Sequence, residues 1–172
     1  MKFRTRLFLF YIGAVGCIAA ALAVYSISFE ERQMYQSLHE QLVVDARLIT
    51  GSFADPLILR DSLRTNRIVA DIARKTKLRI TVIAADGRVL GDSSQDYTRM
   101  PNHRNRPEVR TAFLGGEGFI TRYSQTLKET LIYSALPVQL ENGTIIGVVR
   151  VAKSLSQVKR QLLRIRALIA GG

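Results

Sequence analysis

The stretch Met100–Phe113, MPNHRNRPEVRTAF, holds the densest group of side chains that could bind a ligand. It contains one histidine and three arginines, and a fourth arginine, Arg99, directly precedes it. Guanidinium groups form bidentate pairs with carboxylates and phosphates, imidazole is a common metal ligand, and basic runs also occur in proteins that bind nucleic acids. The stretch therefore allows three alternatives: an anion pocket, a metal site or a nucleic-acid surface.

The second half of this stretch has the pattern of a helix start. Asn105 can cap the helix, Pro107 is pre-set for its first turn, and Glu108 can reach back to the amide of the cap. Free amides and the helix dipole favour negative charge at this position. The basic side chains beside it therefore predict a pocket for a small anion; they are Arg99, His103, Arg104 and Arg106. The alternative is that these arginines are solvated or paired with Asp92, Asp96 and Glu108.

The other chemistry-bearing residues do not form a metal or catalytic motif. The two histidines, His39 and His103, lie in different segments, and Cys17 is the only cysteine, which excludes a disulfide within the chain and a thiolate metal cluster. The sequence has no nucleophile-elbow glycines, no H-E-x-x-H and no glycine-rich phosphate loop. We therefore expect no catalytic residue, no metal and no cofactor.

The net charge of +11 is concentrated at the two ends of the chain. Residues 1–27 carry three basic groups and residues 153–172 carry five, and neither segment contains an acid. The part between them has a net charge of only +3. Membrane topology explains charge at the ends better than nucleic-acid binding does, so we expect no nucleic-acid partner.

The segment from Leu7 to Phe29 has the length of a membrane span. It contains no charged residue over 23 positions. As a helix it would extend about 34 Å, and the hydrocarbon core of a bilayer is about 30 Å thick. The three cations before it favour a cytoplasmic N-terminus, so that the rest of the chain lies outside. A cleaved signal peptide is the alternative, because Ala21–Ala23 resembles a peptidase site, but the apolar run continues past it.

Two helices are expected after this span. Helical spacing continues without Pro or Gly to Thr50, and places Leu38, Leu42 and Ile49 on one face, where a second copy of the chain could pack. The sequence GSFADP, Gly51–Pro56, should end this stalk. A second helix is expected over Leu57–Lys75, with Leu63 and Val69 among its buried residues.

From Leu78 the hydrophobic period changes to two, which predicts five strands. The sequence LRITVIAADGRVLGDSS reads as two strands joined by an Asp86–Gly87 turn. Three more strands are expected near Gly118–Gln125, Glu129–Gln139 and Thr144–Ala152, the last two joined by Asn142–Gly143. Because Asp-Gly and Asn-Gly suit tight hairpins, we expect one antiparallel sheet with helices packed on it.

The C-terminal residues return to helical spacing. Their apolar positions follow a rhythm of three and four that is typical of a seam between helices. These positions are Leu155, Val158, Leu162, Ile165 and Ile169. The final ALIAGG is apolar, so this exit helix is expected to lead into a second membrane helix that the chain contains only in part.

Four segments in order resemble the extracytoplasmic sensor region of PhoR-type sensor histidine kinases. They are ITVIAADGRVLGDSS, MPNHRNRPEV, GEGFITRYSQTLKETLIYSALPV and GTIIGVVRVAKSLSQV, and they follow an apolar N-terminal helix. The resemblance implies an α+β, PAS-like or single Cache-like fold. This fold has a five-stranded antiparallel sheet flanked by long N-terminal and C-terminal helices and preceded by one transmembrane helix. It also implies a homodimeric receptor in a bacterial inner membrane that signals to a response regulator.

The resemblance also places the ligand pocket. In such sensors the segment before the short helix lies beside the concave face of the sheet, so Arg99, His103 and Arg106 would cover a pocket with Arg122 and Tyr133 below it. A partner protein or the state of the membrane could be the stimulus instead of a small anion. The chain lacks a phosphoacceptor-histidine helix and a glycine-rich ATP-binding region, so we expect no kinase activity from it alone.

The expected layout has five parts. They are a cytoplasmic N-terminus (1–6), a transmembrane helix (7–29), a stalk helix (30–55), an extracytoplasmic PAS-like sensor domain (56–153) and an exit helix (154–172). Two alternatives remain for the function. One is the sensor half of a chemoreceptor or of a cyclic-nucleotide signalling enzyme, and the other is a stand-alone membrane-anchored binding protein.

Overall fold

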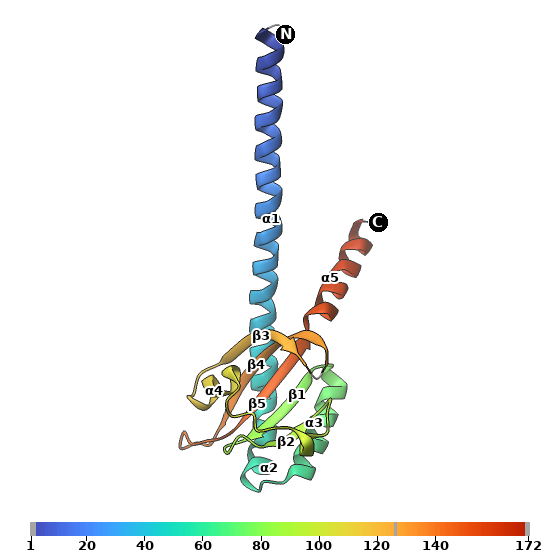
Figure 1. Cartoon of the computed structure of the whole chain (residues 1–172). Coiled ribbons are helices and arrows are strands. Elements are labelled where there is room, and N and C mark those ends of the chain that lie inside the picture. The colour runs from blue at the N-terminus through green and yellow to red at the C-terminus, as the bar shows by residue number, and fades with distance from the viewer. Residues whose placement is uncertain (1–2, 126, 171–172) are drawn as a thin grey trace. The chain divides into compact units, whose positions relative to one another are not determined.

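A computed structural model describes residues 3–125 and 127–170 of the chain. The chain divides into two compact units, Met1–Leu38 and His39–Gly172. The first unit contains only helix, because α1 begins at Phe3 and continues to Thr50 in the second unit. The second unit contains the sheet and the other helices, and its elements position the candidate site (Figure 1).

The sheet of the second unit has five strands and is antiparallel throughout, as the sequence predicts. The strand order is β2-β1-β5-β4-β3. Both predicted hairpin turns are present, with φ of 86° at Gly87 and 81° at Gly143, values that glycine adopts without strain. The strands are β1 (Arg79–Ala84), β2 (Val89–Asp92), β3 (Gly118–Ser124), β4 (Glu129–Gln139) and β5 (Ile145–Ser154).

Helices join and flank these strands. After α1 come η1 (Gly51–Phe53), α2 (Ala54–Ile58), α3 (Ser62–Thr76), η2 (Tyr97–Arg99), α4 (Pro107–Phe113) and α5 (Leu155–Ala170). The predicted break after Thr50 is therefore present as a short 3-10 turn, and α3 begins later than the sequence pattern indicates. Asp61 sets this start, because its side chain accepts a hydrogen bond from the amide of Arg64. Leu63, expected to be buried, is 69% exposed because it lies in the first turn of α3, whereas Val69 is fully buried.

One face of the sheet packs against residues 39–50 of α1 and against α3. On this face Ile80, Val82 and Val149 are fully buried. The ring of His39 in α1 lies 4.0 Å from the ring of Phe119 in β3, and α3 lies beside β1 and β2 (Figure 1). Apolar burial on this face, at about 25 cal/mol per Å², supplies much of the stability of the unit.

The opposite face of the sheet carries α4. Val109 and Ala112 of α4 pack with Ile83, Ala135 and Val148 of the strands in one buried cluster. The start of α4 differs from the sequence prediction: Arg106 is the N-cap residue, without a side-chain capping bond, and Asn105 is not the cap. Glu108 does not reach back to the cap, because its side chain is completely buried against this face of the sheet.

Candidate functional site

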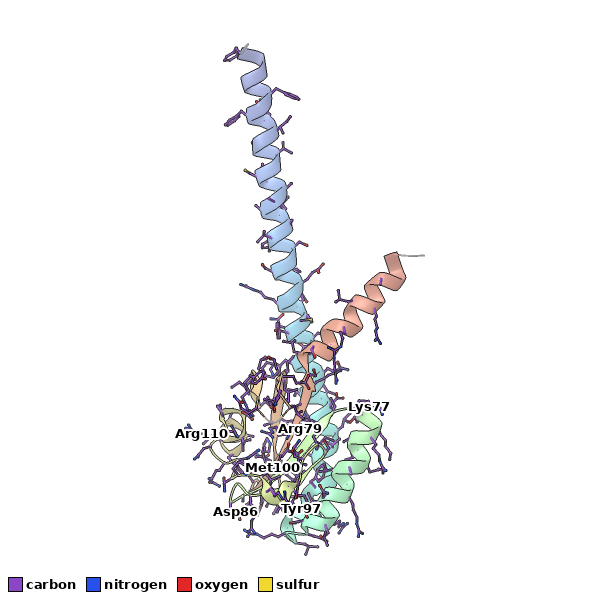
Figure 2. All side chains as sticks on the ribbon, turned by 45° about the vertical axis from the view of Figure 1, so that its right-hand side comes forward. Lys77, Arg79, Asp86, Tyr97, Met100 and Arg110 are labelled. Carbon is purple, nitrogen blue, oxygen red and sulfur yellow. The ribbon has the colours of Figure 1, made fainter. Side chains whose placement is uncertain are left out.

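A cavity of about 350 Å³ lies between this second face of the sheet and the segment that precedes α4. Its volume is within the range of small-molecule sites, about 300 to 1,000 Å³. Figure 2 labels Tyr97 and Met100 on the covering segment and Arg79 on β1. The lining residues are Arg79, Gln95, Asp96, Arg99, Met100, Pro101, His103, Arg106, Arg122, Ser124, Gln125, Tyr133 and Arg150.

Five of the six residues that the sequence analysis assigned to a pocket line this cavity. The exception is Arg104, whose guanidinium donates to the carbonyl oxygen of Ala85 and lies over the ring of Phe113. The strand register explains why residues from different strands meet: Arg122 of β3 lies opposite Leu131, two positions from Tyr133 on the same face of β4. Arg99, His103 and Arg106 come from the covering segment, as expected. Their assignment to ligand binding stays a prediction.

Arg150 is the central cation of the site, and the sequence analysis missed it. Its side chain is 3% exposed, and its guanidinium donates to the carboxylate oxygen Oε1 of Glu108 at 3.2 Å and to the hydroxyl of Thr81 at 3.1 Å. Burial lowers the pKa of Arg150, while the neighbouring Glu108 carboxylate opposes this shift. Because the guanidinium of arginine is not deprotonated in proteins, the group remains a cation.

A second ion pair continues this network toward the edge of the sheet. Thr81 donates its hydroxyl hydrogen to Oδ2 of Asp92 at 2.7 Å, and Arg79 donates to the same oxygen at 3.2 Å. The Asp92 side chain is completely buried, and its second oxygen accepts from the amides of Ser94 and Gln95. The side chains of Arg79, Asp92, Thr81 and Arg150 thus form a continuous polar network across β1, β2 and β5. Arg150 connects this network to Glu108.

Tyr133 forms the aromatic floor of the cavity. The guanidinium of Arg122 lies 4.4 Å from the centre of its ring, and that of Arg150 lies 5.0 Å from the same centre. Such cation–π contacts contribute about 0.5 to 2 kcal/mol each, depending on how dry the site is. The ring therefore holds two cations side by side, although like charges repel.

One carboxylate compensates these two cations. Arg122 contacts the same oxygen of Glu108 that Arg150 uses, at a longer distance of 3.5 Å. Among the ion pairs of the described residues, none involves Arg106, and Arg99 pairs with Asp96 on an exposed edge. The five arginines of the lining thus face three carboxylates, those of Glu108, Asp92 and Asp96. Of the two predicted alternatives, ion pairing is present for Arg99 with Asp96 and for Arg122 with Glu108, and anion binding stays a prediction.

His103 is a neutral side chain in this basic site. It is 5% exposed, and its Nδ1 lies 2.8 Å from the carbonyl oxygen of Pro101. Burial, followed by the nearby charge of Arg150, lowers the pKa of His103 to about 4. At neutral pH the ring is uncharged, so Nδ1 carries the hydrogen and donates it to this carbonyl.

This low pKa predicts a loss of stability in mild acid. Between pH 6.5 and pH 4 the unfolded chain binds a proton at His103 that the folded chain does not bind, so the free energy of unfolding falls as the pH falls. The contribution of His103 between pH 7 and pH 5 is a loss of roughly 2 kcal/mol. Urea unfolding of the wild type and of His103→Asn measures it, because asparagine keeps a donor near the Nδ1 position but does not titrate. If the free energy of unfolding changed equally with pH in both proteins between pH 7 and pH 5, the prediction would be contradicted.

The described residues contain no group of three or more His, Cys, Asp or Glu side chains that could hold a metal ion. The lining of the cavity suits charge recognition. Arginines, an aromatic floor and a neutral imidazole can bind and orient an anion.

The first unit contains a helix that could cross a membrane. Its most apolar window has a mean hydropathy of 2.0, and none of it is buried within the protein. Phe8, Val15 and Leu22 are among its exposed apolar side chains. By length and composition this helix fits the predicted membrane segment.

The predicted seams between two copies require a correction at α1. Leu42 is 1% exposed and Leu38 is 7% exposed, so the side chain of Leu42 is used within its own chain and is not free for a second copy. Ile49 is half-buried. In α5, Val158 is also buried and Leu155 is half-buried, while the side chains of Leu162 and Ile165 lie outside the described residues.

The long N-terminal helix and the five-stranded antiparallel sheet are the fold of a Cache-like sensor domain. The chain belongs to the single Cache-like family, whose model matches residues 33–154. This match confirms the Cache-like fold that the sequence analysis predicted. It shows a Cache-like sensor domain, and it does not show that the domain is of the PhoR type.

Solved structures with this fold include sensor domains of histidine kinases and ligand-binding domains of chemoreceptors. The sensor domain of E. coli DcuS has 18% identity and a TM-score of 0.59, over 74% of this chain and 96% of DcuS. The sensor domain of the V. cholerae histidine kinase DctB has 20% identity and a TM-score of 0.59, over 79% of this chain and 59% of DctB. The ligand-binding domain of the Campylobacter jejuni chemoreceptor Tlp3, in complex with 4-methylisoleucine, has 14% identity and a TM-score of 0.56, over 75% of this chain and 54% of Tlp3.

The chain thus spans nearly all of the DcuS domain and less than two thirds of the other two. At these identities the likeness concerns the fold. The sequence of this chain has no significant match among curated proteins.

Proposed function

We propose that this chain is the sensory input module of a membrane-bound sensor histidine kinase of the PhoR type, and that its cavity binds a small anion. The family is a sensor family, and the same fold occurs in the histidine kinase DctB. In this proposal residues 1–6 are cytoplasmic, the span at 7–29 stays in the membrane, residues 30–55 form the stalk, and the sensor domain at 56–153 lies outside. The exit helix at 154–172 carries the signal inward to a kinase and its response regulator.

The observation that carries the anion proposal is the shared carboxylate in the cavity. Arg122 and Arg150 both contact Oε1 of Glu108, and Arg106 has no ion pair among the described residues. Arg122 also has a buried Nε without a hydrogen-bond partner in the described part of the chain. A bound carboxylate or phosphate would supply the missing negative charge, because guanidinium binds both in bidentate geometry.

An anion that fits this site should stabilise the folded chain in proportion to its binding. We expect that thermal unfolding of the full chain in detergent micelles shifts upward with succinate, citrate or phosphate, and that uncharged succinamide has no effect. Arg106→Ala should weaken the binding about tenfold, since hydrogen bonds to charged groups contribute about 1.5 to 3 kcal/mol. Adding Arg122→Ala should abolish the shift.

Arg110→Ala is the matched control for this experiment. Arg110 is exposed on the outer side of α4 and does not line the cavity (Figure 2). An anion-dependent shift of equal size in Arg110→Ala and the wild type would support the site. A shift that survives the double substitution of Arg106 and Arg122 would show that the anion binds elsewhere.

The input domain of a chemoreceptor is the second candidate function. The similarity to the Tlp3 domain favours it, since that domain has the same fold in a chemoreceptor. The gene sequence downstream of Gly172 separates the two. A phosphoacceptor-histidine helix and an ATP-binding region would support the kinase, and a long methyl-accepting helical hairpin would support the chemoreceptor. In both receptors two copies of the exit helix would pair.

A further inference from the structure

Glu129, at the start of β4, makes an unusual set of contacts with the start of α5. Its carboxylate oxygen Oε2 accepts hydrogen bonds from the hydroxyls of Ser154, the last residue of β5, and Ser156, in the first turn of α5. The two serine hydroxyls also lie 2.9 Å apart. Hydrogen bonds from hydroxyls to a carboxylate are stronger than those between neutral groups.

Ser154 is also the capping residue of the exit helix. Its Oγ accepts a hydrogen bond from the amide of Gln157, three residues later, which is the geometry of a helix N-cap. The hydroxyl therefore accepts from the helix and donates to Glu129. The carboxylate fixes the direction of this hydroxyl and thereby holds the first turn of α5 on the sheet.

Glu129 lies on a hairpin whose other strand lines the cavity. In the register of β3 and β4, Ser124 is the direct partner of Glu129. Ser124 and Gln125 line the cavity, and Arg122 lies two residues earlier on the same strand. The hydroxyl of Ser124, which is 3% exposed, accepts from the amide of Leu127 and closes the hairpin. A single short element thus has the end of β3 in the cavity and the start of β4, at Glu129, on the exit helix.

A second hollow in the surface lies beside the start of β4 and the start of the exit helix. Its lining includes Leu127 and Glu129 from the β4 side of the hairpin, Ala73 from α3, and Ser154 and Gln157 from the start of the exit helix. No residue of β3 lines this second hollow, and no residue from Leu127 to Glu129 lines the first cavity. The end of the hairpin, Ser124 to Glu129, therefore lies between the two hollows, which share Arg79 of β1.

We propose that the β3–β4 hairpin transmits occupancy of the cavity to the exit helix, with Ser124 and Glu129 as its two positioning residues. This inference rests on the proposed sensor function, and it concerns how the sensor domain passes its signal to the exit helix. A ligand that draws Arg122 or Ser124 inward moves the hairpin, and the carboxylate of Glu129 then shifts relative to Ser154 and Ser156. The cap of α5 is strengthened or weakened accordingly, which alters the position from which the exit helix leaves the domain.

Amide hydrogen exchange of the full chain in lipid nanodiscs tests this proposal without any ligand. We expect Glu129→Ala to raise the exchange rate of peptides from the first turns of α5, Leu155–Arg164, by roughly fivefold, the factor that corresponds to the loss of a helix cap. Glu129→Gln keeps an acceptor without its charge, so its effect should be smaller. Exchange in α3 should be unchanged in both variants.

The transmission itself is tested from the cavity side. Ser124→Ala removes the hydroxyl that closes the hairpin, and we expect it to raise α5 exchange in the same direction as Glu129→Ala. Combined with Glu129→Ala it should add little, because both act through one element. The matched control is Arg106→Ala, which alters the cavity from the covering segment and should leave α5 exchange unchanged.

Unchanged α5 exchange in Glu129→Ala would overturn the proposal, and so would fully additive effects of Ser124→Ala and Glu129→Ala. Either result leaves anion binding measurable in the same proteins through the thermal shift with succinate. Conversely, a chain that binds none of the tested anions but shows the expected exchange pattern would retain the hairpin coupling and remove the anion as its stimulus. The two proposals therefore fail separately.

Discussion

Glu108→Ala is expected to lower the free energy of unfolding by about 3 to 5 kcal/mol, the usual cost of removing one partner from a buried ion pair. The substitution leaves the guanidinium of Arg150 buried at 3% exposure without its carboxylate. It also removes the contact of Arg122, so two neighbouring cations over the ring of Tyr133 lose their compensation. Urea unfolding followed by far-ultraviolet circular dichroism measures the loss.

A double substitution separates the lost charge pair from the lost packing. Glu108→Leu combined with Arg150→Met replaces both charges by apolar groups of similar size, and its destabilisation should be clearly smaller than that of Glu108→Ala. If Glu108→Ala lost less than about 1 kcal/mol, the pair would be solvated in the folded protein, and the cavity would not be the dry, charged site described above. In the same experiment an added anion should recover part of the stability of Glu108→Ala, because it takes the place of the carboxylate.

Gly118→Ala is the second substitution with a large expected effect. A methyl group at this position would lie 1.8 Å from the carbonyl oxygen of Glu108 and 2.6 Å from its carbonyl carbon. These are backbone atoms of α4, so the contact cannot be relieved by rotating a side chain, and α4 must move away from the sheet. We expect a loss of at least about 3 kcal/mol, at the upper end of the cost of overpacking a core.

Gly118→Ala should also weaken the site, since α4 brings Glu108 to Arg150. The matched control is Gly51→Ala, where an added methyl group meets no atom within 4 Å and the change should be close to neutral. Thermal unfolding of both variants measures the difference. Equal melting temperatures for the two variants would mean that α4 does not lie against β3 as closely as the structure places it.

Local patterns along the chain determined the elements. Alternation of apolar and polar residues marked the strands, and Asp86–Gly87 and Asn142–Gly143 marked the turns, because a tight hairpin needs backbone angles that glycine adopts at low cost. The uncharged run from Leu7 to Phe29 marked a helix long enough to span a membrane. The arginines and the histidine of the covering segment were found because they cluster beside a proline-marked helix start.

The partners of those residues were decided by the tertiary structure. Arg150 lies between valines in a strand that is buried on both faces, and this was the one signal in the sequence that could have identified it. Glu108 was interpreted as a local cap because capping depends on neighbours in sequence, whereas its actual partner is 42 residues away. Leu42 was assigned to a seam between copies, yet helical spacing shows only that a face is apolar, not what covers it.

The sequence by itself therefore determined the order of the elements, the apolar segment near the N-terminus and the basic character of the covering segment, because each depends on residues close together in the chain. Only the tertiary structure decided that Arg122 and Arg150 meet over Tyr133 with a single shared carboxylate at Glu108. The register of the strands and the contact of Gly118 with α4 set this arrangement. Both join residues that are distant in the chain, and no local pattern records the distance between them.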